Sequence, residues 1–532
     1  MNCSCSDPKA GTLNLEHSYK YRPLDDYLIA KERWQREKDV LLERAALQDF
    51  TDPGRVLAEL DEALHQRYLV TNRRWAAGAN PYLSVSANGR FRIATPKQED
   101  KPQEPLQPFL PQRHYVPLPE ILATVNRHAL FTDELRHWHQ RQPQRVREKA
   151  LYAGIMGLGC GIGTRRMARI AQGVGETELE HAVHWHFSLD NLQAANDRIL
   201  RLTSELDLPD IYRRSPESLH TASDGQKFEV RKESLNANYS FKYFGKGQGV
   251  SAYSFIDERQ LLWHSLVFSA AERESAYVID GLMRNDVVKS TIHSTDSHGY
   301  SEAIFAAAHL IGISYAPRLK NLDRQTLYTF SSRRNVDRSS WAVTPDKYVN
   351  DELVEANWDD ILRVITTIKL KETTASDIFR RLNSYAKQHV LYRALKAFGQ
   401  IIKSLFILRY LDELALRQAV EQQLSRIELA NRFTRDVAVG NPREFLQAEK
   451  EDQEIAEACN RLIKNSIICW NYLYLENKLA TLRDSGQRQV LMTAIASHSM
   501  ISWAHVNLLG EYDFSDEKLR DSFGPRSSRV AA

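Results

Sequence analysis

Three carboxylates in this chain are candidates for metal-dependent chemistry. Asp224 ends or interrupts a short run of strand-forming residues, and Asp296 ends a later run. Carboxylates at the ends of neighbouring strands can converge on one point, which is the geometry that a pair of divalent ions needs. Hard oxygen ligands suit Mg²⁺ or Mn²⁺ rather than zinc, and neither segment contains cysteine. The two aspartates are therefore candidate metal ligands.

Glu428 is the third candidate, and it lies in a segment with helical spacing. At about 3.6 residues per turn, Glu428 shares one helix face with Leu424, Asn431 and Arg435. A glutamate on the same face as a leucine can point inward toward the two aspartates. It can equally be a surface residue that pairs with Arg435 or another basic residue.

Simpler explanations also exist for both aspartates. Asp224-Gly225 is a common hairpin turn, and Asp296 can cap a helix that begins near Ser301. Acidic residues are frequent in turns, so spacing alone favours these structural explanations.

Two further clusters are weaker candidates. The alternating glycines of 157–163 match neither of the common phosphate-binding loop patterns, so we expect close helix packing or a turn before Arg165. His181, His184 and His186 lie close together, but they have no ligand spacing that indicates zinc. We expect these histidines to be packed or at the surface.

The elements that must position these residues are both helical and extended. Helical spacing covers 27–48 and 56–68, and seven of the 18 prolines fall between Pro96 and Pro119, which indicates a linker. The pattern from 118 to 210 is again helical. Strand-like runs, a helix, a strand and a further helix then follow in the order 219–223, 227–230, 239–244, 250–256, 276–284, 288–295 and 302–311. From 358 to 482 almost everything is predicted to be helical, so we expect an α+β, mostly helical protein with a mixed sheet.

Composition excludes several classes of protein. The chain has 532 residues, five cysteines and a net charge of +3 from 71 basic and 68 acidic residues. It contains no uncharged apolar stretch of the roughly 18–20 residues that a membrane span needs, and its start has no apolar signal region. An odd number of cysteines makes a disulfide scaffold improbable. We expect a reduced, cytoplasmic protein that is neither membrane-bound, secreted nor fibrous.

One segment carries local positive charge. Between 318 and 338 there are six basic residues and two acidic ones. The basic residues are Arg318, Lys320, Arg324, Arg333, Arg334 and Arg338. The segment follows the second aspartate, so phosphates approaching a metal site could meet it, although a solvated loop has the same composition.

Several segments together resemble the Tn3-family transposases. They occur in the family's order over nearly the whole chain, and they include 19–28, 158–168, 220–228, 294–319, 470–471 and 505–512. The resemblance implies an RNase H-like catalytic domain with a mixed sheet, a helical insertion and preceding helical domains. It also implies a triad in which Asp224 and Asp296 match the two aspartates of the family. Glu428 is the corresponding glutamate, with Glu444 and Glu451 as alternatives.

The resemblance also implies a mechanism and its supporting groups. The triad would hold two Mg²⁺ ions, with Mn²⁺ as a possible substitute, to cut DNA at transposon ends and join the released 3′-hydroxyl to target DNA. His298, Asn431 and Arg435 would support the triad, and the basic segment would contact DNA. The expected partners are terminal inverted repeats, target DNA and a second copy of the chain, with replicative transposition at the bacterial nucleoid and no membrane contact.

Family members are about twice this length, and the matching region begins near the start of the chain. We therefore expect a truncated or split transposase, with a separate N-terminal half as a possible partner. The alternatives are an inert remnant that binds DNA or transposase, and an RNase H-like nuclease. The expected regions are a helical N-terminal region (1–95), a proline-rich linker (96–119), a helical domain (120–215), the first part of the core with both aspartates (216–330), a mostly helical insertion (331–416), the second part of the core with the glutamate helix (417–482) and a tail (483–532).

Overall fold

The structure is a computed structural model that describes residues 21–86, 91–97, 105–112, 115–139, 146–285, 287–297, 299–330, 338–384 and 389–523. The chain divides into two compact units, each assembled from separate stretches. Unit 1 comprises Met1–Gln98, Arg273–Arg284 and Thr291–Gln422, and unit 2 comprises Glu99–Glu272, Asn285–Ser290 and Gln423–Ala532. Within the described stretches, no helix combines the length and apolar character that crossing a bilayer requires.

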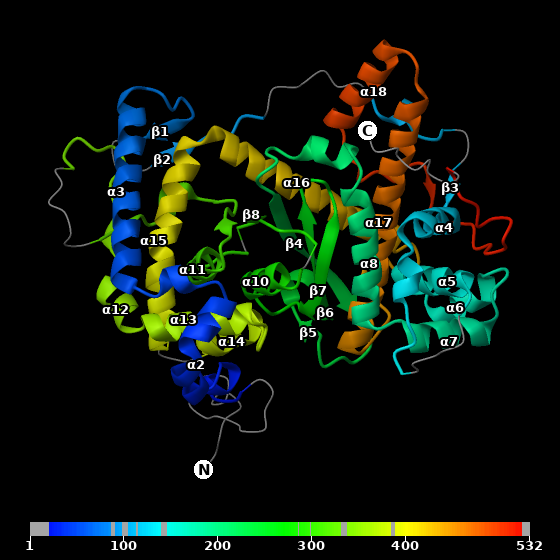
Figure 1. Ribbon diagram of the computed structural model, residues 1–532, viewed down its shortest axis with the longest axis horizontal. Helices are drawn as coiled ribbons and strands as arrows, with labels where there is room; N and C mark the ends of the chain where they lie inside the picture. Colours follow the sequence, from blue (N-terminus) through cyan, green and yellow to red (C-terminus); the bar gives the residue numbers. More distant parts are fainter. Residues whose placement is uncertain are drawn as a thin grey trace. The chain divides into compact units, whose positions relative to one another are not determined.

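Unit 1 is mostly helical (Figure 1). Its helices are α2 (Lys31–Arg44), α3 (Pro53–Ala76), α10 (Ser275–Met283), α11 (Glu302–Leu310), α12 (Asp351–Ala356), α13 (Trp358–Lys369), α14 (Ala375–Ser384), α15 (Val390–Asp412) and the start of α16 (Leu414–Val437), with short 3-10 helices at Leu24–Tyr27, Gln48–Phe50 and Leu322–Arg324. Its strands form three short pairs. They are β1 (Leu83–Val85) antiparallel to β2 (Phe91–Ile93), β8 (Ile292–Thr295) parallel to β9 (Ser314–Tyr315), and β10 (Tyr328–Thr329) parallel to β11 (Lys347–Tyr348).

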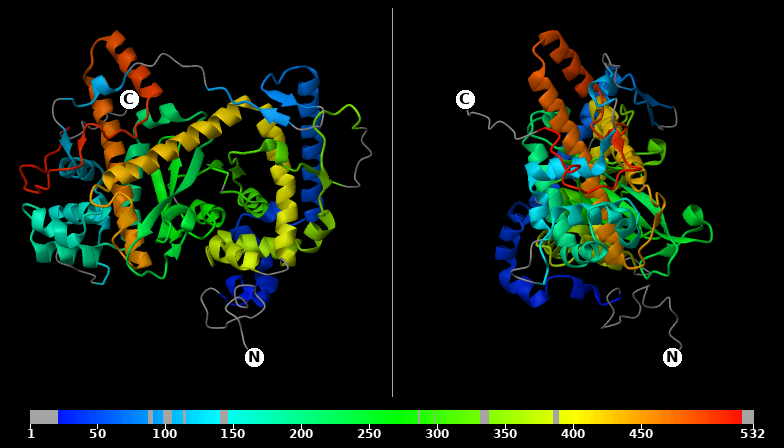
Figure 2. Two further views of the ribbon diagram at one scale, coloured as in Figure 1. Left: turned by 180° about the vertical axis from the view of Figure 1, so that it is seen from behind. Right: turned by 90° about the vertical axis from the view of Figure 1, so that its right-hand side faces the viewer.

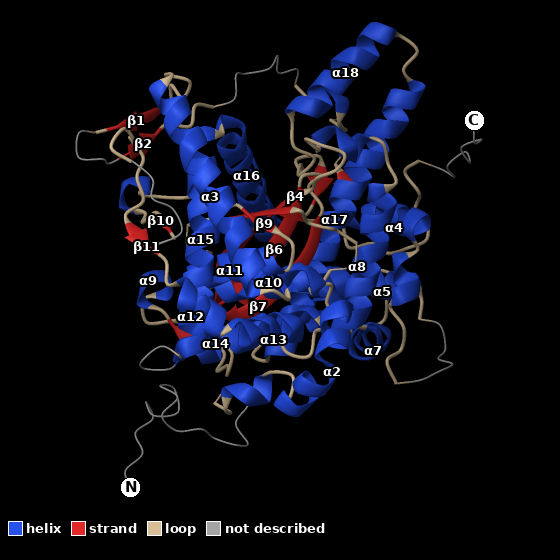
Figure 3. Ribbon diagram, turned by 60° about the vertical axis from the view of Figure 1, so that its left-hand side comes forward, coloured by secondary structure: helices blue, strands red, loops and turns tan. Residues whose placement is uncertain are grey.

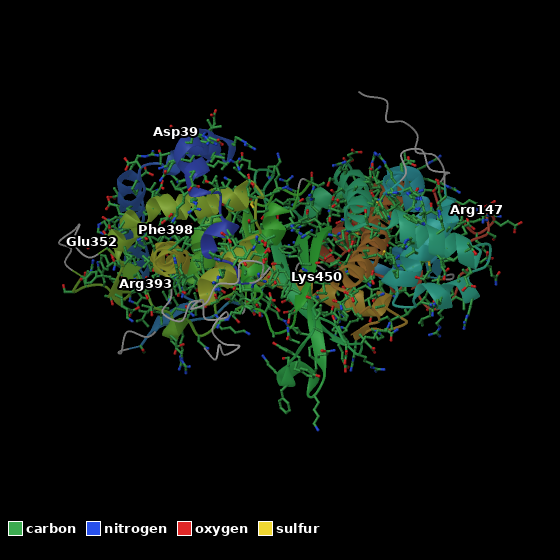
Figure 4. The ribbon with its side chains drawn as sticks, turned by 90° about the horizontal axis from the view of Figure 1, so that it is seen from below. Asp39, Arg147, Glu352, Arg393, Phe398 and Lys450 are labelled. Atoms are coloured by element: carbon green, nitrogen blue, oxygen red, sulfur yellow. The ribbon has the colours of Figure 1, made fainter. Side chains whose placement is uncertain are left out.

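The core of unit 1 is built around the contact between α11 and α15. A Cβ atom added at Gly399 would lie 1.7 Å from the carbonyl oxygen of Glu302, so only glycine permits the two helices to approach this closely. Phe398, which is labelled in Figure 4, packs edge-on against Trp358 at a ring distance of 5.1 Å. The Asp52 side chain caps α3 by accepting from the backbone N–H groups of Gly54 and Arg55, and the helix predicted over 56–68 is confirmed as part of α3.

Unit 2 combines a sheet with helices (Figures 1 and 3). Its helices are α4 (Leu118–Ala129), α5 (Glu148–Gly159), α6 (Thr164–Ile170), α7 (Glu176–His186), α8 (Leu189–Ser204), α9 (Phe241–Phe244), the rest of α16, α17 (Lys450–Thr481) and α18 (Ser485–Ser497), with 3-10 helices at Gln107–Phe109, Phe131–Glu134 and Leu208–Tyr212. Its strands are β3 (Val116–Pro117), β4 (His220–Val230), β5 (Asn238–Tyr239), β6 (Gln248–Asp257), β7 (Leu262–Ser269), β12 (Glu444–Phe445) and β13 (Val506–Asn507).

The sheet of unit 2 is mixed, as predicted. β4, β6 and β7 pair antiparallel in that order, β5 pairs with one end of β6, and β12 runs parallel to β4. Apolar side chains of β4, β6 and β7, among them Phe228, Val250 and Val267, form a buried cluster. The long helix α17 contacts β7, α8, α5 and α4, so it organises the helical side of the unit.

Several local predictions need correction. Asp224-Gly225 does not form a hairpin turn, because β4 continues through it and pairs Asp224 with Ser254 and Gly225 with Tyr253. The expected strand over 239–244 is a two-residue strand followed by the short helix α9. Strand β7 was not predicted, although its run of buried apolar and aromatic residues is typical of a central strand.

The glycine run of α5 does pack closely, as expected. A Cβ atom at Gly159 would lie 2.8 Å from backbone atoms of Cys459 and Asn460 in α17. The chain then turns before α6 begins at Thr164. Of the five cysteines, the structure describes Cys160, Cys459 and Cys469, all of which are buried and none of which is in a disulfide.

Candidate active site

Asp224 is held in position by a residue of the predicted helix face. Its side chain is half-buried near the middle of β4. The Asn431 side-chain amide donates to Asp224 Oδ2 at 3.0 Å. Asn431 is itself buried with 8% exposure, so the bond is largely shielded from water. Asn431, which was expected on the same helix face as Glu428, thus contacts Asp224 directly.

A polar cavity of about 890 Å³ lies between β4 and this face of α16. Its lining includes three carboxylates, Asp224, Glu229 and Glu428. Its basic residues are Lys227, Arg432, Arg435 and Arg443. The carboxylates can bind divalent metal ions, and the basic side chains around them can contact phosphates. The cavity therefore suits a phosphate-containing substrate that is bound together with metal ions.

Glu428 and Arg435 both line the cavity, and both are exposed. Arg435 Nε lies 3.0 Å from the side-chain oxygen of Gln226, once that amide is oriented to donate to the backbone oxygen of Asn431. The ion pairs of the described residues include none between Glu428 and Arg435. They therefore do not support the alternative in which these two side chains simply pair. The helix face therefore presents a carboxylate, an amide and a guanidinium to the same space.

Asp296 lies in unit 1, directly after β8. Its Oδ1 and its backbone oxygen both accept from the backbone N–H of Gly299 at 3.2 Å. The turn is fixed further by the Tyr315 hydroxyl, which donates to the Gly299 carbonyl at 2.8 Å. Asp296 does not cap the next helix, because Ser301 occupies the N-cap position of α11.

Glu274 is a residue that the sequence analysis missed. It occupies the N-cap position of α10, and its carboxylate lies within 4.8 Å of the Asp296 carboxylate in the same unit. Nothing in the local sequence distinguishes it from other acidic residues at helix starts. Only the packing of unit 1 brings it beside Asp296.

The two alternative glutamates lie elsewhere. Glu444 belongs to β12 and pairs with Arg231 Nε at 3.1 Å, while Glu451 is exposed in the first turn of α17. Neither lines the cavity that contains Asp224 and Glu428. Geometry within unit 2 thus favours Glu428 over both as the partner of Asp224.

The basic segment lies in unit 1 and is only partly described. The Arg318 backbone N–H donates to the Thr295 carbonyl at 2.9 Å, so this residue lies beside the turn of Asp296. Lys320 and Arg324 are exposed, and the Arg338 guanidinium lies 5.9 Å from the centre of the Trp341 ring. Arg333, Arg334 and the supporting residue His298 lie outside the described residues.

Two buried groups near the site have shifted pKa values. Burial lowers the pKa of His293, on β8, to about 3, so this side chain is neutral at physiological pH. Burial also lowers the pKa of Lys464, on α17, to about 8. Lys464 Nζ donates to Thr434 Oγ1 at 2.7 Å, which ties α17 to α16 one turn beyond Asn431.

The three histidines of α7 divide between the interior and the surface. His186 is buried, whereas His181 and His184 are exposed. Among the described residues, no group with the proximity that a metal requires contains a histidine. Packed and surface histidines are what the sequence predicted.

Comparison with known proteins identifies a matching family and several relatives. A family model described as the Tn3 transposase DDE domain matches residues 120–512. The chain is 25% identical over 516 residues to the transposase for transposon Tn1546 of Enterococcus faecium, covering 96% of this chain and 51% of that protein. It is 28% identical over 511 residues to the transposase for transposon Tn2501 of Escherichia coli, covering 95% and 50%. For the transposase for transposon Tn4556 of Streptomyces fradiae, the identity is 25% over 515 residues, covering 95% and 56%. The chain spans about half the length of the curated relatives it matches.

Proposed function

This chain belongs to the Tn3 transposase DDE-domain family, and we propose that it carries the catalytic centre of a metal-dependent DNA transposase. The proposed reaction is cleavage at transposon ends followed by transfer of the 3′-hydroxyl to target DNA, as in replicative transposition. The observation that carries the proposal is the Asn431–Asp224 bond, because it places Asp224 in one cavity with Glu428 and four basic residues.

The order of elements supports an RNase H-like core. Three antiparallel strands (β4, β6 and β7) come first, and α10, β8, α11 and β9 follow them along the chain. The first aspartate lies on the first strand, and the second follows the strand after the antiparallel set.

The available donors fit Mg²⁺ or Mn²⁺. Asp224, Asp296 and Glu428 offer hard carboxylate oxygens, and Glu274 offers another beside Asp296. When bound, two such ions would supply positive charge that stabilises the attacking and leaving oxygens of phosphoryl transfer.

The protein's own groups orient the substrate. Asn431 holds one carboxylate oxygen of Asp224 in place, so the Asp224 side chain would lose little conformational entropy when it binds a metal ion. Lys227, Arg432, Arg435 and Arg443 would contact phosphates at the cavity, and Arg318 would do so beside Asp296. We extend the proposal to Lys320, Arg324, Arg333, Arg334 and Arg338 as DNA contacts, and to His298 as a supporting residue.

Terminal inverted repeats and target DNA are the proposed partners, on which two copies of the chain would act together at the nucleoid.

Strand cleavage tests the proposal. The full chain is incubated with Mg²⁺ and labelled DNA that carries the ends flanking its own gene, and nicking and joining to a plasmid are measured. A second arm adds the N-terminal half of a relative in trans. Loss of both activities in Asp224→Asn and Asp296→Asn is expected, and unchanged activity in either variant would refute the triad.

The third acidic residue has its own matched comparison. Glu428→Gln should abolish cleavage, whereas Glu444→Gln and Glu451→Gln should retain it. The reason is that, of these three glutamates, Glu428 is the one that lines the cavity with Asp224. If Glu428→Gln retained cleavage and Glu444→Gln or Glu451→Gln abolished it, the third acidic role would belong to that other glutamate. DNA binding without cleavage by the unaltered chain would favour an inert remnant, and cleavage of DNA lacking transposon ends would favour a nuclease.

A further inference from the structure

The segment between β4 and β6, residues 231–247, exposes an unusual number of large apolar side chains. We call this segment the aromatic tip. Phe241 is 87% exposed, Tyr239 is 74% exposed and Tyr243 is 47% exposed. Burial of such side chains is normally favourable, so their exposure in one short segment indicates a binding surface.

The aromatic tip is a built structure. Gly249 leaves room for the Phe244 ring, because a Cβ atom there would lie 2.4 Å from that ring. β5 pairs with β6, and the Asn238 side chain donates to Ser269 Oγ at 2.7 Å. The Asn236 amide also donates to Gln453 Oε1, at 3.0 Å. One aromatic residue therefore anchors the tip while its neighbours remain in solvent.

The exposed rings are interleaved with positive charge. From 227 to 246 there are five basic residues and two acidic ones. The ammonium groups of Lys242 and Lys227 lie 4.9 and 5.3 Å from the centre of the Tyr243 ring. Aromatic rings for stacking and cations for phosphates are the combination by which proteins hold single-stranded nucleic acid.

The aromatic tip is continuous with the candidate active site. Tyr243, Phe244 and Lys227 line the same cavity as Asp224. The aromatic tip extends away from the helices of its unit in two views, the right-hand panel of Figure 2 and Figure 4. A DNA strand that leaves the cavity beside Lys227 would thus reach the exposed rings of the aromatic tip directly.

We propose that the aromatic tip binds unpaired DNA next to the cleavage point, with bases stacked on Phe241 and Tyr239 and phosphates on Lys242 and Lys246. The inference rests on the proposed function and adds the element that holds the strand separated at the cut. A protein surface or a second copy of the chain is the competing occupant. The net positive charge and the continuity with the cavity favour DNA.

Binding to forked DNA tests the inference. Fluorescence anisotropy compares a duplex that carries a short unpaired flap with a fully paired duplex of the same sequence. Phe241→Ala should weaken binding of the forked DNA about tenfold, the effect of removing one stacking platform, and change duplex binding less than twofold. Phe241→Trp should retain binding, whereas Phe241→Leu should not, because leucine is apolar but cannot stack.

The controls separate the possible failures. Trp138 is another exposed aromatic residue of unit 2, at 58% exposure, and Trp138→Ala should bind forked DNA as the unaltered chain does. Wild-type affinity in Phe241→Leu would overturn the inference. So would a loss of self-association without a loss of DNA binding, measured by sedimentation. If the unaltered chain cleaves transposon ends but Phe241→Ala binds forked DNA normally, only the tip proposal fails. If the unaltered chain neither binds nor cleaves DNA, the proposed function fails with it.

Discussion

Replacing Asn431 by leucine isolates the bond that positions Asp224. Leucine has a similar volume and suits a site with 8% exposure, so the helix should keep its packing. The substitution removes the donor 3.0 Å from Asp224 Oδ2. It also removes the Asn431 Oδ1 atom, which is buried without a hydrogen-bond partner among the described residues, and this removal offsets part of the stability that the lost bond contributed.

The magnitude follows from the type of bond. A hydrogen bond to a charged acceptor contributes about 1.5–3 kcal/mol, and each 1.4 kcal/mol is a factor of ten. If the bond is needed to hold Asp224 as a ligand, strand cleavage at limiting Mg²⁺ should slow by roughly 10- to 100-fold. Part of that loss should return at high Mg²⁺, because excess ion compensates for a less ordered ligand.

The assay is the rate of strand cleavage across a series of Mg²⁺ concentrations, with the melting temperature of each variant measured in parallel. Asp436→Asn is the matched control, because Asp436 is exposed on the same helix and does not line the cavity. A wild-type rate and Mg²⁺ dependence in Asn431→Leu would refute the reasoning. A loss of activity that merely follows a loss of stability would do so as well.

Two predictions concern the stability of unit 1. Gly399→Ala should destabilise the protein by about 1–3 kcal/mol in urea, because the clash with the Glu302 carbonyl at 1.7 Å outweighs a gain in helix propensity of about 1 kcal/mol. Unchanged stability in this variant would contradict the close approach of the two helices. Burial raises the pKa of Asp280 to about 6 from an ordinary 3.8, so the folded state holds this proton more tightly than the unfolded state and loses stability as the pH rises from about 4 to 6. Asp280→Asn should gain up to about 3 kcal/mol over the unaltered protein across that interval, by chemical unfolding at each pH, and a flat difference would contradict the assignment.

The candidate site was predictable wherever a local rule applied. Helical periodicity placed Glu428, Asn431 and Arg435 on one face, and all three line the cavity. The strand–turn pattern around Asp296 was visible as well, although its helix-capping role was wrong. Glu274 could not be found in this way, because an acidic residue at a helix start carries no sign of what packs against it.

The same division holds for the fold. Apolar and β-branched runs identified β4, β6 and β8, but Asp224-Gly225 was misread as a possible turn because the local preference of that pair is overridden by pairing with β6. Residues 239–244 of the aromatic tip were predicted as a strand for a similar reason. Its aromatic residues have high strand propensity, yet only two residues of it find a pairing partner.

The sequence by itself determined the family motifs, the periodicity of the helices and the chemical type of the site, since these depend on residues a few positions apart. Tertiary structure alone decided which groups meet. Asp224 and Asn431 are 207 residues apart, and the two units are each assembled from separate stretches of the chain. Contacts of that range depend on the packing of whole elements, so no local pattern encodes the bond that holds Asp224.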